Sequence, residues 1–553
     1  MPLQSDLRFH VANKALVRRF SVTLVPNNWD DSGYRTLFDV EFFDEHAKRH
    51  PIGAVKIGEY GLKNAPQGSN PKSSPGRPTL PDTFAVLDRN THFSVGQDTS
   101  YYEAINRLDA DYAGFRQDYL SAMNDMAFRK ATRTRAMQEP VTETSLLRTL
   151  SWKAVRDQFA RLARGGASVT AYKLTLPIRD ELGAQQLVCT VRPKAMPPEN
   201  IRILIGRNGS GKTTTLRDLA KMLIERSEHS EIEDVIKRQR DQLANLVSVS
   251  FSAFDPFEPI ETRQSLDGIK YRYIGLKTYD PFPNQLTSNK TDEFEDGHRP
   301  DKRSENPVVE LGRDDHSRWR PMTVPELDAH AVTAVHNCVG IRAQRQRLVK
   351  ALTLFEADLN FASFGIRDMV ARAGPNDDIR RRLQPLVEIM SAGHKIAMLT
   401  ISQLVVTVQE KTLVLIDEPE AHLHPPLLSA FVRALSGLLT DRNGLAIIAT
   451  HSPVVLQEAP RSCVRIVENL FSEVTLREPQ LETFGENVGT LTGEVFGLEV
   501  TSTGYHALLQ EVADQHTTYE AALRAFDGQL GGEGRAILRA MISANSRSRD
   551  VGY

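Results

Sequence analysis

Cysteine is scarce in this sequence of 553 residues, which contains only Cys189, Cys338 and Cys463. So few thiols, spaced so far apart, exclude a disulfide framework and a four-thiolate zinc site. Long apolar runs are also lacking: none reaches the length of a bilayer span, and the charged amino terminus has no signal-peptide core. These absences predict a soluble, cytoplasmic protein that does not contact a membrane.

An excess of charge of one sign is lacking too. The 68 Lys and Arg residues nearly balance the 70 Asp and Glu residues, which leaves a net charge of -2. Any contact with nucleic acid must therefore come from local basic runs. Residues 342–347 and 380–382 are such runs, but acidic residues lie near them, so a solvated helix face is an alternative at least as good.

The sequence does contain a glycine-rich phosphate-binding pattern. The segment 206–213, GRNGSGKT, matches G-x-x-x-x-G-K-[ST] and lies between an apolar strand pattern and a helical one. Glycines let backbone N–H groups surround phosphate oxygens, Lys212 neutralises phosphate charge, and the Thr213 hydroxyl can bind Mg²⁺. We therefore predict bound ATP and Mg²⁺. The predicted nucleotide contacts are Gly206, Asn208, Gly209, Ser210, Gly211, Lys212, Thr213 and Thr214.

A second motif follows an apolar run, because Leu413–Ile416 leads directly into Asp417 and Glu418. Parallel strands that are buried on both faces give such runs, and a carboxylate at the end of one is placed to hold Mg²⁺. We predict that Asp417 is a metal ligand and that Glu418 is the general base for the attacking water. The alternative, a strand that merely ends in solvated acids, is disfavoured by the phosphate-binding pattern.

Two short patterns complete the candidate site. His451 follows the apolar run 445–448 and is predicted to sense the γ-phosphate through a hydrogen bond. Ser391 and Gly393 precede a helical pattern, and a helix N-terminus with a hydroxyl can bind the γ-phosphate of a nucleotide held by a second subunit. A structural role for His451 and a simple helix cap at Ser391 are the alternatives.

Together these phrases resemble a known class of protein. GRNGSGKTT, MSAGHK, LVLIDEPEAHLHPP and IIATHSP are similar to the ABC ATPases of the RecF/SMC/OLD group, above all to the PtuA ATPase of Septu-type and retron-linked antiviral systems. The resemblance implies an α/β fold: an ABC-type P-loop ATPase with a mixed sheet, an antiparallel N-terminal lobe, helical insertions and a helical C-terminal region. It also implies an ATP-hydrolysing sensor subunit that forms a homodimer or higher homo-oligomer. A separate HNH-type nuclease subunit, similar to PtuB, would be its partner, and nucleic acid would bind through the complex.

The sequence departs from the family pattern at the signature and after the strand at 247–251. Ala392 replaces the first Gly of the signature, and His394 replaces its Gln. The glutamine that ABC proteins place after that strand is missing. Three residues stay open as its substitute: Ser252, Asp255 and Gln264.

Other functions have a weaker basis. An OLD-like nuclease needs a strand-end Glu and an Asp-x-Asp pair beyond the ATPase motifs, and no such pair is present. A RecF-like DNA-repair ATPase stays open, whereas an SMC protein needs long heptad arms and a transporter ATPase a different loop after Asp417. His422 and His424 are candidates for a metal pair, although loop packing or a subunit contact is favoured. We expect no other cluster of metal ligands outside the ATP site.

We expect eight segments along the chain. They are an N-terminal β part of the ATPase lobe (1–62), a linker (63–82), a helical insertion (83–164), an ATPase core with the phosphate-binding motif (165–279), a flexible insertion (280–322), a helical region (323–389), an ATPase core with the signature and the two strand-end motifs (390–484) and a C-terminal helical region (485–553). Residues 20–25 and 37–42 predict an antiparallel hairpin, and Thr323 with Glu326 predicts a capping box. Amphipathic helices after residue 485 could dock a nuclease or pack onto the core.

Overall fold

The computed structural model describes residues 7–65, 76–167, 169–178, 185–225, 230–252, 269–279, 319–374, 377–470, 473–496 and 504–550. They divide into two compact units. The first comprises Met1–Ile201 with Thr213–Ala449, and the second comprises Arg202–Lys212 with Thr450–Tyr553. Both units combine strands and helices, so the predicted α/β fold class is confirmed. None of the described helices is both long and apolar enough to span a bilayer.

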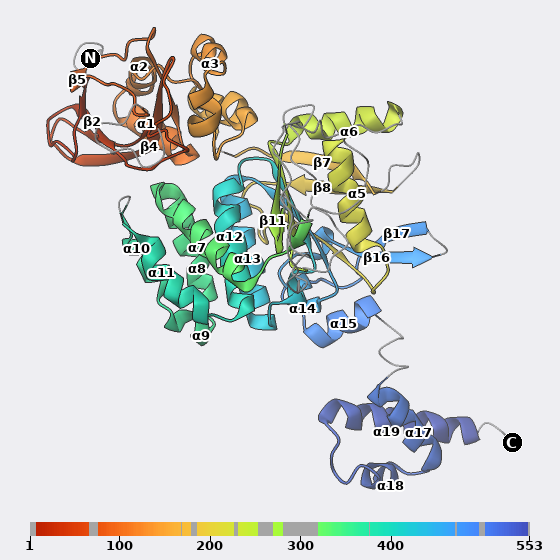
Figure 1. Ribbon diagram of the computed structural model, residues 1–553. Coiled ribbons are helices and arrows are strands. Elements are labelled where there is room, and N and C mark those ends of the chain that lie inside the picture. The colour runs from red at the N-terminus through yellow and green to blue at the C-terminus, as the bar shows by residue number, and fades with distance from the viewer. Residues whose placement is uncertain are drawn as a thin grey trace, which may run out of the picture. The chain divides into compact units, whose positions relative to one another are not determined.

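A six-stranded sheet opens the first unit, in the order β5-β1-β2-β3-β4-β6. Its strands are β1 (Arg8–Val11), β2 (Ser21–Pro26), β3 (Leu37–Phe43), β4 (Arg49–Glu59), β5 (Thr83–Phe84) and β6 (His92–Gly96). β2 and β3 pair antiparallel, which confirms the predicted hairpin, but β1 pairs parallel to β2. Helices α1 (Thr99–Asp111) and α2 (Phe115–Ala122) share a hydrophobic core with this sheet (Figure 1).

Residues 83–164, expected as a helical insertion, thus contribute two strands to the sheet before their helices begin. The helical part continues with α3 (Lys130–Ala136), the π-helical segments Thr142–Leu146 and Ala154–Phe159, and α4 (Ala160–Leu162). Apolar residues from Phe9 to Ala163 belong to one buried cluster. Strands and helices of this region form one layered structure, because a sheet must bury its apolar face against a second layer.

Four parallel strands of the first unit lie side by side as part of a second sheet, in the order β11-β10-β14-β15. They are β10 (Asn245–Ser250), β11 (Lys270–Gly275), β14 (Thr412–Asp417) and β15 (Leu445–Thr450). Residues 412–416 of β14 and every residue of β15 are buried, which explains why the sequence shows apolar runs here and not an alternating pattern. The remaining strands and helices of this region are α5 (Lys212–Ile224), α6 (Ser230–Gln242) and the hairpin of β7 (Tyr172–Pro177) and β8 (Gln186–Val191).

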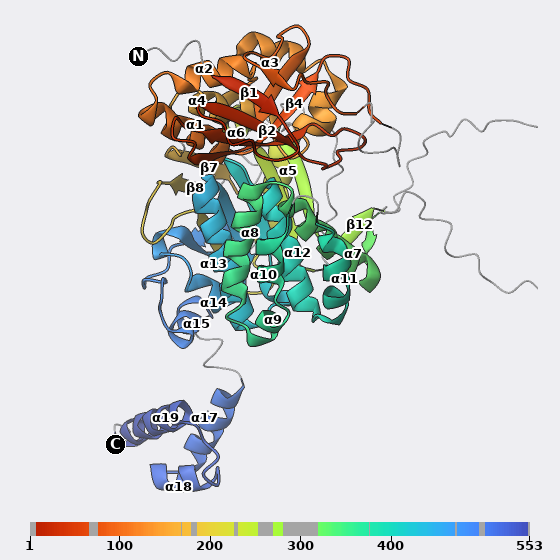
Figure 2. The same cartoon turned by 90° about the vertical axis from the view of Figure 1, so that its left-hand side faces the viewer.

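The helices described between residues 324 and 442 form one group of neighbouring helices (Figures 1 and 2). They are α7 (Val324–Val339), α8 (Arg342–Phe355), α9 (Leu359–Ser363), α10 (Ile366–Arg372), α11 (Ile379–Ile389), α12 (Ala392–Thr407) and α13 (Pro425–Arg442). α7 begins at the predicted capping box, where the Thr323 N–H donates to the Glu326 carboxylate over 2.8 Å. Of the expected insertion 280–322, residues 280–318 lie outside the described part. The adjoining strands β12 (Lys277–Tyr279) and β13 (Trp319–Pro321) pair antiparallel.

The second unit contains β9 (Ile201–Ile205), of which only Ile201 belongs to the first unit. β9 pairs parallel to β16 (Val464–Leu470), and β16 forms a hairpin with β17 (Glu473–Arg477). Its helices are α14 (Pro453–Leu456), the 3-10 turn Arg461–Cys463, α15 (Val488–Phe496), α17 (Tyr505–Gln515), α18 (Tyr519–Arg524) and α19 (Gly532–Asp550). The last three share a small apolar core, so the predicted C-terminal helices are present.

Candidate nucleotide-binding site

The predicted phosphate-binding loop follows β9 in the second unit. Gly209 and Gly211 have φ angles of 78° and 91°, in a left-handed conformation that residues with side chains rarely adopt. At Gly206, a Cβ atom would lie 2.4 Å from the carbonyl oxygen of Val467. At each of these three positions, steric constraints therefore favour glycine over larger residues. The loop makes a turn that side chains would prevent.

Two polar side chains of this loop fit a bound phosphate. Lys212 is only 4% exposed, and its ammonium donates hydrogen bonds of 2.9 Å to the carbonyl oxygens of Gly206 and Arg207. The buried hydroxyl of Ser210 has no hydrogen-bond partner within the described ranges. Because a buried polar group without a partner is costly, an anion that accepts a hydrogen bond from Ser210 would remove that cost. Asn208 and Thr214 are exposed.

Thr213, the last residue of the pattern, lies in the first unit with the strand-end acid. Its hydroxyl donates to Oδ1 of Asp417 over 3.1 Å. The register of the parallel sheet places Asp417 between Ser250 of β10 and Ala449 of β15. Thr213, Ser248, Ser250 and Asp417 line a small cavity. Hydroxyl and carboxylate oxygens are the donors that Mg²⁺ takes, together with water and phosphate, so these residues fit that ion.

Glu418 has an unusual backbone conformation for a residue with a side chain. Its φ and ψ angles are 42° and 60°, in the left-handed region, which costs roughly 1–3 kcal/mol. A hydrogen bond of 2.9 Å from its N–H to the carbonyl oxygen of Ala449 helps to hold it, and the 3-10 turn Pro419–Ala421 follows directly. Strained residues of this kind gather at functional sites. The side chain is partly exposed, so water can reach the carboxylate.

The signature residues lie at the start of α12. Ser391 is exposed and caps this helix, where its hydroxyl accepts a hydrogen bond from the N–H of His394 over 3.4 Å. A Cβ atom on Gly393 would lie 2.5 Å from the carbonyl oxygen of His422. Gly393 therefore allows the loop that follows Asp417 to approach the first turn of α12. Ala392 and His394, the two residues that depart from the ABC signature, both lie in that turn.

His451 belongs to the second unit. Its side chain is exposed, so a ligand can reach it from solvent. The neighbouring Thr450 is buried, and its hydroxyl accepts a hydrogen bond of 2.9 Å from the N–H of Ser452. Of the three substitutes for the missing glutamine, Asp255 and Gln264 lie outside the described residues. The γ-phosphate role of His451 stays a prediction.

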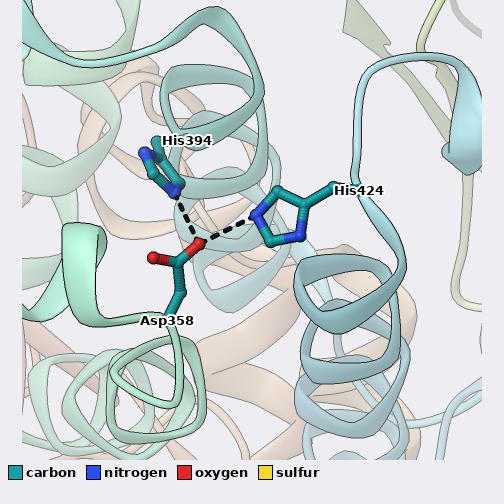
Figure 3. A group of neighbouring side chains, drawn as sticks. All are labelled: Asp358, His394 and His424. Carbon is teal, nitrogen blue, oxygen red and sulfur yellow. Dashed lines mark hydrogen bonds and ion pairs between the residues drawn. The ribbon is translucent and has the colours of Figure 1, made fainter.

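Sequence interpretation missed one cluster. Oδ2 of Asp358 lies 3.1 Å from Nε2 of His394 and 2.8 Å from Nε2 of His424 (Figure 3). His424 therefore belongs with these two residues and not in a pair with His422, and the expectation of no further cluster of metal ligands is wrong. Burial would raise the pKa of Asp358, but hydrogen bonds, first that from His394 and then that from the Phe361 N–H, lower it to about 2. In the sequence, only the His-x-His spacing of His422 and His424 indicated a metal site here.

Two comparisons with known proteins, one for a domain and one for the whole chain, bear on the kinship of this sequence. Residues 201–457 match the family described as "AAA domain, putative AbiEii toxin, Type IV TA system". The chain is also 34% identical to protein ea59 of Escherichia phage lambda, over 96% of its own length and 95% of the length of ea59. This chain belongs to the ea59 family.

The AAA match gives this ea59-family chain a P-loop ATPase domain. All the predicted motifs, from Gly206 to His451, fall inside the matched range. The N-terminal sheet and the C-terminal helices α17, α18 and α19 fall outside it, but the similarity to ea59 covers nearly the whole chain. The predicted class, a P-loop ATPase of the defence-associated and RecF-like type, is thus confirmed for the nucleotide-binding domain.

Proposed function

We propose that this protein is an ABC-type ATPase that acts as the sensor subunit of an antiphage defence complex. The hydrogen bond between Thr213 and Asp417 carries the ATPase part of the proposal. In P-loop ATPases the hydroxyl at this motif position and the strand-end carboxylate hold the same Mg²⁺, so the two groups must be neighbours. The hydrogen bond brings these two groups together from distant segments of the chain, as shared coordination of one ion requires.

The chain's own residues suggest a division of labour in hydrolysis. Lys212 and Ser210 bind the phosphates, and Thr213 and Asp417 would hold Mg²⁺, which supplies charge neutralisation when bound. Glu418 accepts a proton from water while the water oxygen bonds to the γ-phosphorus. The bond from that phosphorus to the β,γ-bridging oxygen breaks, which leaves ADP and phosphate.

ATP would also join two copies of the chain head to tail. The observation that supports this step is the exposed hydroxyl of Ser391 at the N-terminus of α12, a helix of 16 residues. The positive end of a helix together with a hydroxyl suits the γ-phosphate of a nucleotide held by a second copy. Gly393 supports the same surface, since it keeps the loop at His422 close to this turn.

Light scattering of the Glu418→Gln variant with ATP and Mg²⁺ tests the dimer. We expect a dimer that the additional substitution Ser391→Arg abolishes, because the arginine fills the space for the partner's phosphate. Thr518→Arg is the matched control, since Thr518 is another exposed hydroxyl residue that caps a helix. A dimer of undiminished stability in the Ser391→Arg protein would leave Ser391 as a helix cap only.

The defence part of the proposal rests on kinship. The family description names a toxin of a toxin–antitoxin system, and the relative ea59 belongs to a phage. Both fit a protein that acts in conflict between phages and bacteria. A separate HNH-type nuclease would make the damaging cut, so the purified chain should cleave neither DNA nor RNA with Mg²⁺, Mn²⁺ or Zn²⁺. Cleavage by the pure chain, lost in a variant of its own residues, would favour the OLD-like alternative.

A further inference from the structure

Three helix starts in the first unit bring Asp358, His394 and His424 together (Figure 3). Asp358 caps α9, His394 lies in the first turn of α12, and His424 caps α13. One oxygen of the Asp358 carboxylate faces Nε2 of both rings, at 3.1 Å from His394 and 2.8 Å from His424. The three atoms lie within 4.8 Å of one another.

We propose that these three side chains form a binding site for a divalent transition-metal ion of the Zn²⁺ class. Two imidazole nitrogens and one carboxylate oxygen are a donor set that suits Zn²⁺, Fe²⁺ and Co²⁺ better than Mg²⁺ or Ca²⁺. In a tetrahedral zinc site with bonds of about 2.0–2.1 Å, neighbouring ligand atoms are about 3.3 Å apart. The two distances to Asp358 are close to that value, and the two ring nitrogens already lie within 4.8 Å of each other.

The surroundings hold two of the ligands and leave the third accessible. Oδ1 of Asp358 accepts hydrogen bonds from the N–H groups of Asn360 and Phe361, which orients Oδ2 toward the rings. The buried ring of His394 makes edge contacts with Phe361 and Phe364. The side chain of His424 is 50% exposed, so an ion can enter from solvent and keep water in a remaining position.

The positions of the imidazole protons differ between the metal-bound site and the hydrogen-bonded cluster without a metal. Without a metal, each ring donates from Nε2 to the shared oxygen, whereas coordination through Nε2 requires the proton of each ring to be on Nδ1. Nδ1 of His424 now accepts a contact of 3.5 Å from the Leu427 N–H, and metal binding would end it. That bond is at the outer limit of hydrogen-bond length, so its loss costs little. The site lies outside the Thr213–Asp417 pair and does not depend on the proposed ATPase.

A Co²⁺ titration of the full-length protein tests the site, with an excess of Mg²⁺ present to fill oxygen-only sites. Four- or five-coordinate Co²⁺ absorbs visible light much more strongly than the hexaaqua ion. We expect saturable absorption with one equivalent of Co²⁺, reversed by Zn²⁺. No thiolate band should accompany it, because the chain's three cysteines are buried elsewhere. His424→Ala and Asp358→Asn should each weaken binding by roughly tenfold or more.

His422→Ala is the matched control, because His422 is an exposed imidazole two positions away and outside the cluster. It should bind Co²⁺ with the affinity of the wild type. Asp358→Asn retains Oδ1 for the α9 cap, and Zn²⁺ should raise the thermal midpoint of the wild type but not that of the variants. Equal Co²⁺ affinity in the wild type, His424→Ala and Asp358→Asn would overturn the proposal. So would the absence of inner-sphere absorption in a folded wild-type protein.

Discussion

The hydroxyl of Thr213 donates a hydrogen bond to Oδ1 of Asp417 over 3.1 Å, although the two residues are 204 positions apart. Thr213 is in the first turn of α5, and Asp417 ends β14. The contact joins a residue of the phosphate-binding pattern to the acid that follows the apolar run. Substitutions at either end should therefore change the response to Mg²⁺ before they change the fold.

Replacing Thr213 by Val keeps the size of the side chain but removes its hydroxyl. We expect ATP hydrolysis to fall roughly 10²-fold and the Mg²⁺ concentration for half-maximal activity to rise roughly tenfold. Thr213→Ser keeps the oxygen and should stay close to the wild type. The measurement is phosphate release as a function of Mg²⁺ concentration. If the curves of Thr213→Val and the wild type superimpose, Thr213 is not a ligand of Mg²⁺.

Glu418→Gln should separate binding from hydrolysis. The amide cannot accept the proton of the attacking water, so phosphate release should fall by roughly 10²–10⁴-fold, while the affinity for ATP stays unchanged. Glu420→Gln, on the same turn, is the control and should hydrolyse ATP normally. Calorimetric titration with ATP and a phosphate-release assay on both variants are the measurements. Normal release by Glu418→Gln would assign the base to another residue.

The close approach at Gly393 predicts a loss of stability on substitution. A methyl group there would lie 2.5 Å from the carbonyl oxygen of His422, so Gly393→Ala should cost roughly 1–3 kcal/mol. Gly437→Ala in α13 meets no atom within 4 Å and should be neutral or stabilise by up to about 1 kcal/mol. Thermal midpoints of the two variants test this difference. Midpoints that shift in the same direction by the same amount would contradict it.

The buried carboxyl of Asp125 predicts a pH dependence of stability. Burial raises its pKa to about 6, although hydrogen bonds from the Phe128 N–H and the Tyr102 hydroxyl oppose the shift. The folded protein therefore keeps a proton that the unfolded chain loses near pH 4. This stabilisation is complete below about pH 4 and is lost as the pH rises through about 6, a change of roughly 3 kcal/mol.

Asp125→Asn resembles the protonated carboxyl at every pH and should not show this loss. Urea denaturation of both proteins between pH 4 and 8 should show the wild type losing stability relative to the variant up to about pH 6. Above that value the difference should stay constant. Parallel curves over the whole range would mean that Asp125 ionises in the folded protein as it does in water.

The nucleotide-binding motifs could be predicted because each is local in sequence. The spacing of Gly206, Gly209 and Gly211 follows from the tight turn of the loop that contains them. The four-residue apolar run before Asp417 reflects a parallel strand that is buried on both faces. The capping box at Thr323 is equally local. In each case, one short segment contains the physical reason for its own conformation.

The N-terminal sheet and the metal cluster could not be predicted in the same way. β1 follows no strand pattern that reveals its parallel pairing with β2, and the addition of β5 and β6 depends on contacts between segments 33 to 75 positions apart. Asp358 meets His394 and His424 only because the starts of three helices converge, and a single acid before a helix pattern is indistinguishable from an ordinary cap.

ATP hydrolysis by the purified full-length protein, compared with Lys212→Ala, tests the central claim most directly. Lys221→Ala is the control, since Lys221 is an exposed lysine of the same helix. We predict Mg²⁺-dependent phosphate release by the wild type and the control. Lys212→Ala should neither bind nor hydrolyse ATP, because the phosphates lose their main counter-ion. Equal phosphate release by the wild type and Lys212→Ala would contradict the assignment of this loop as the nucleotide site.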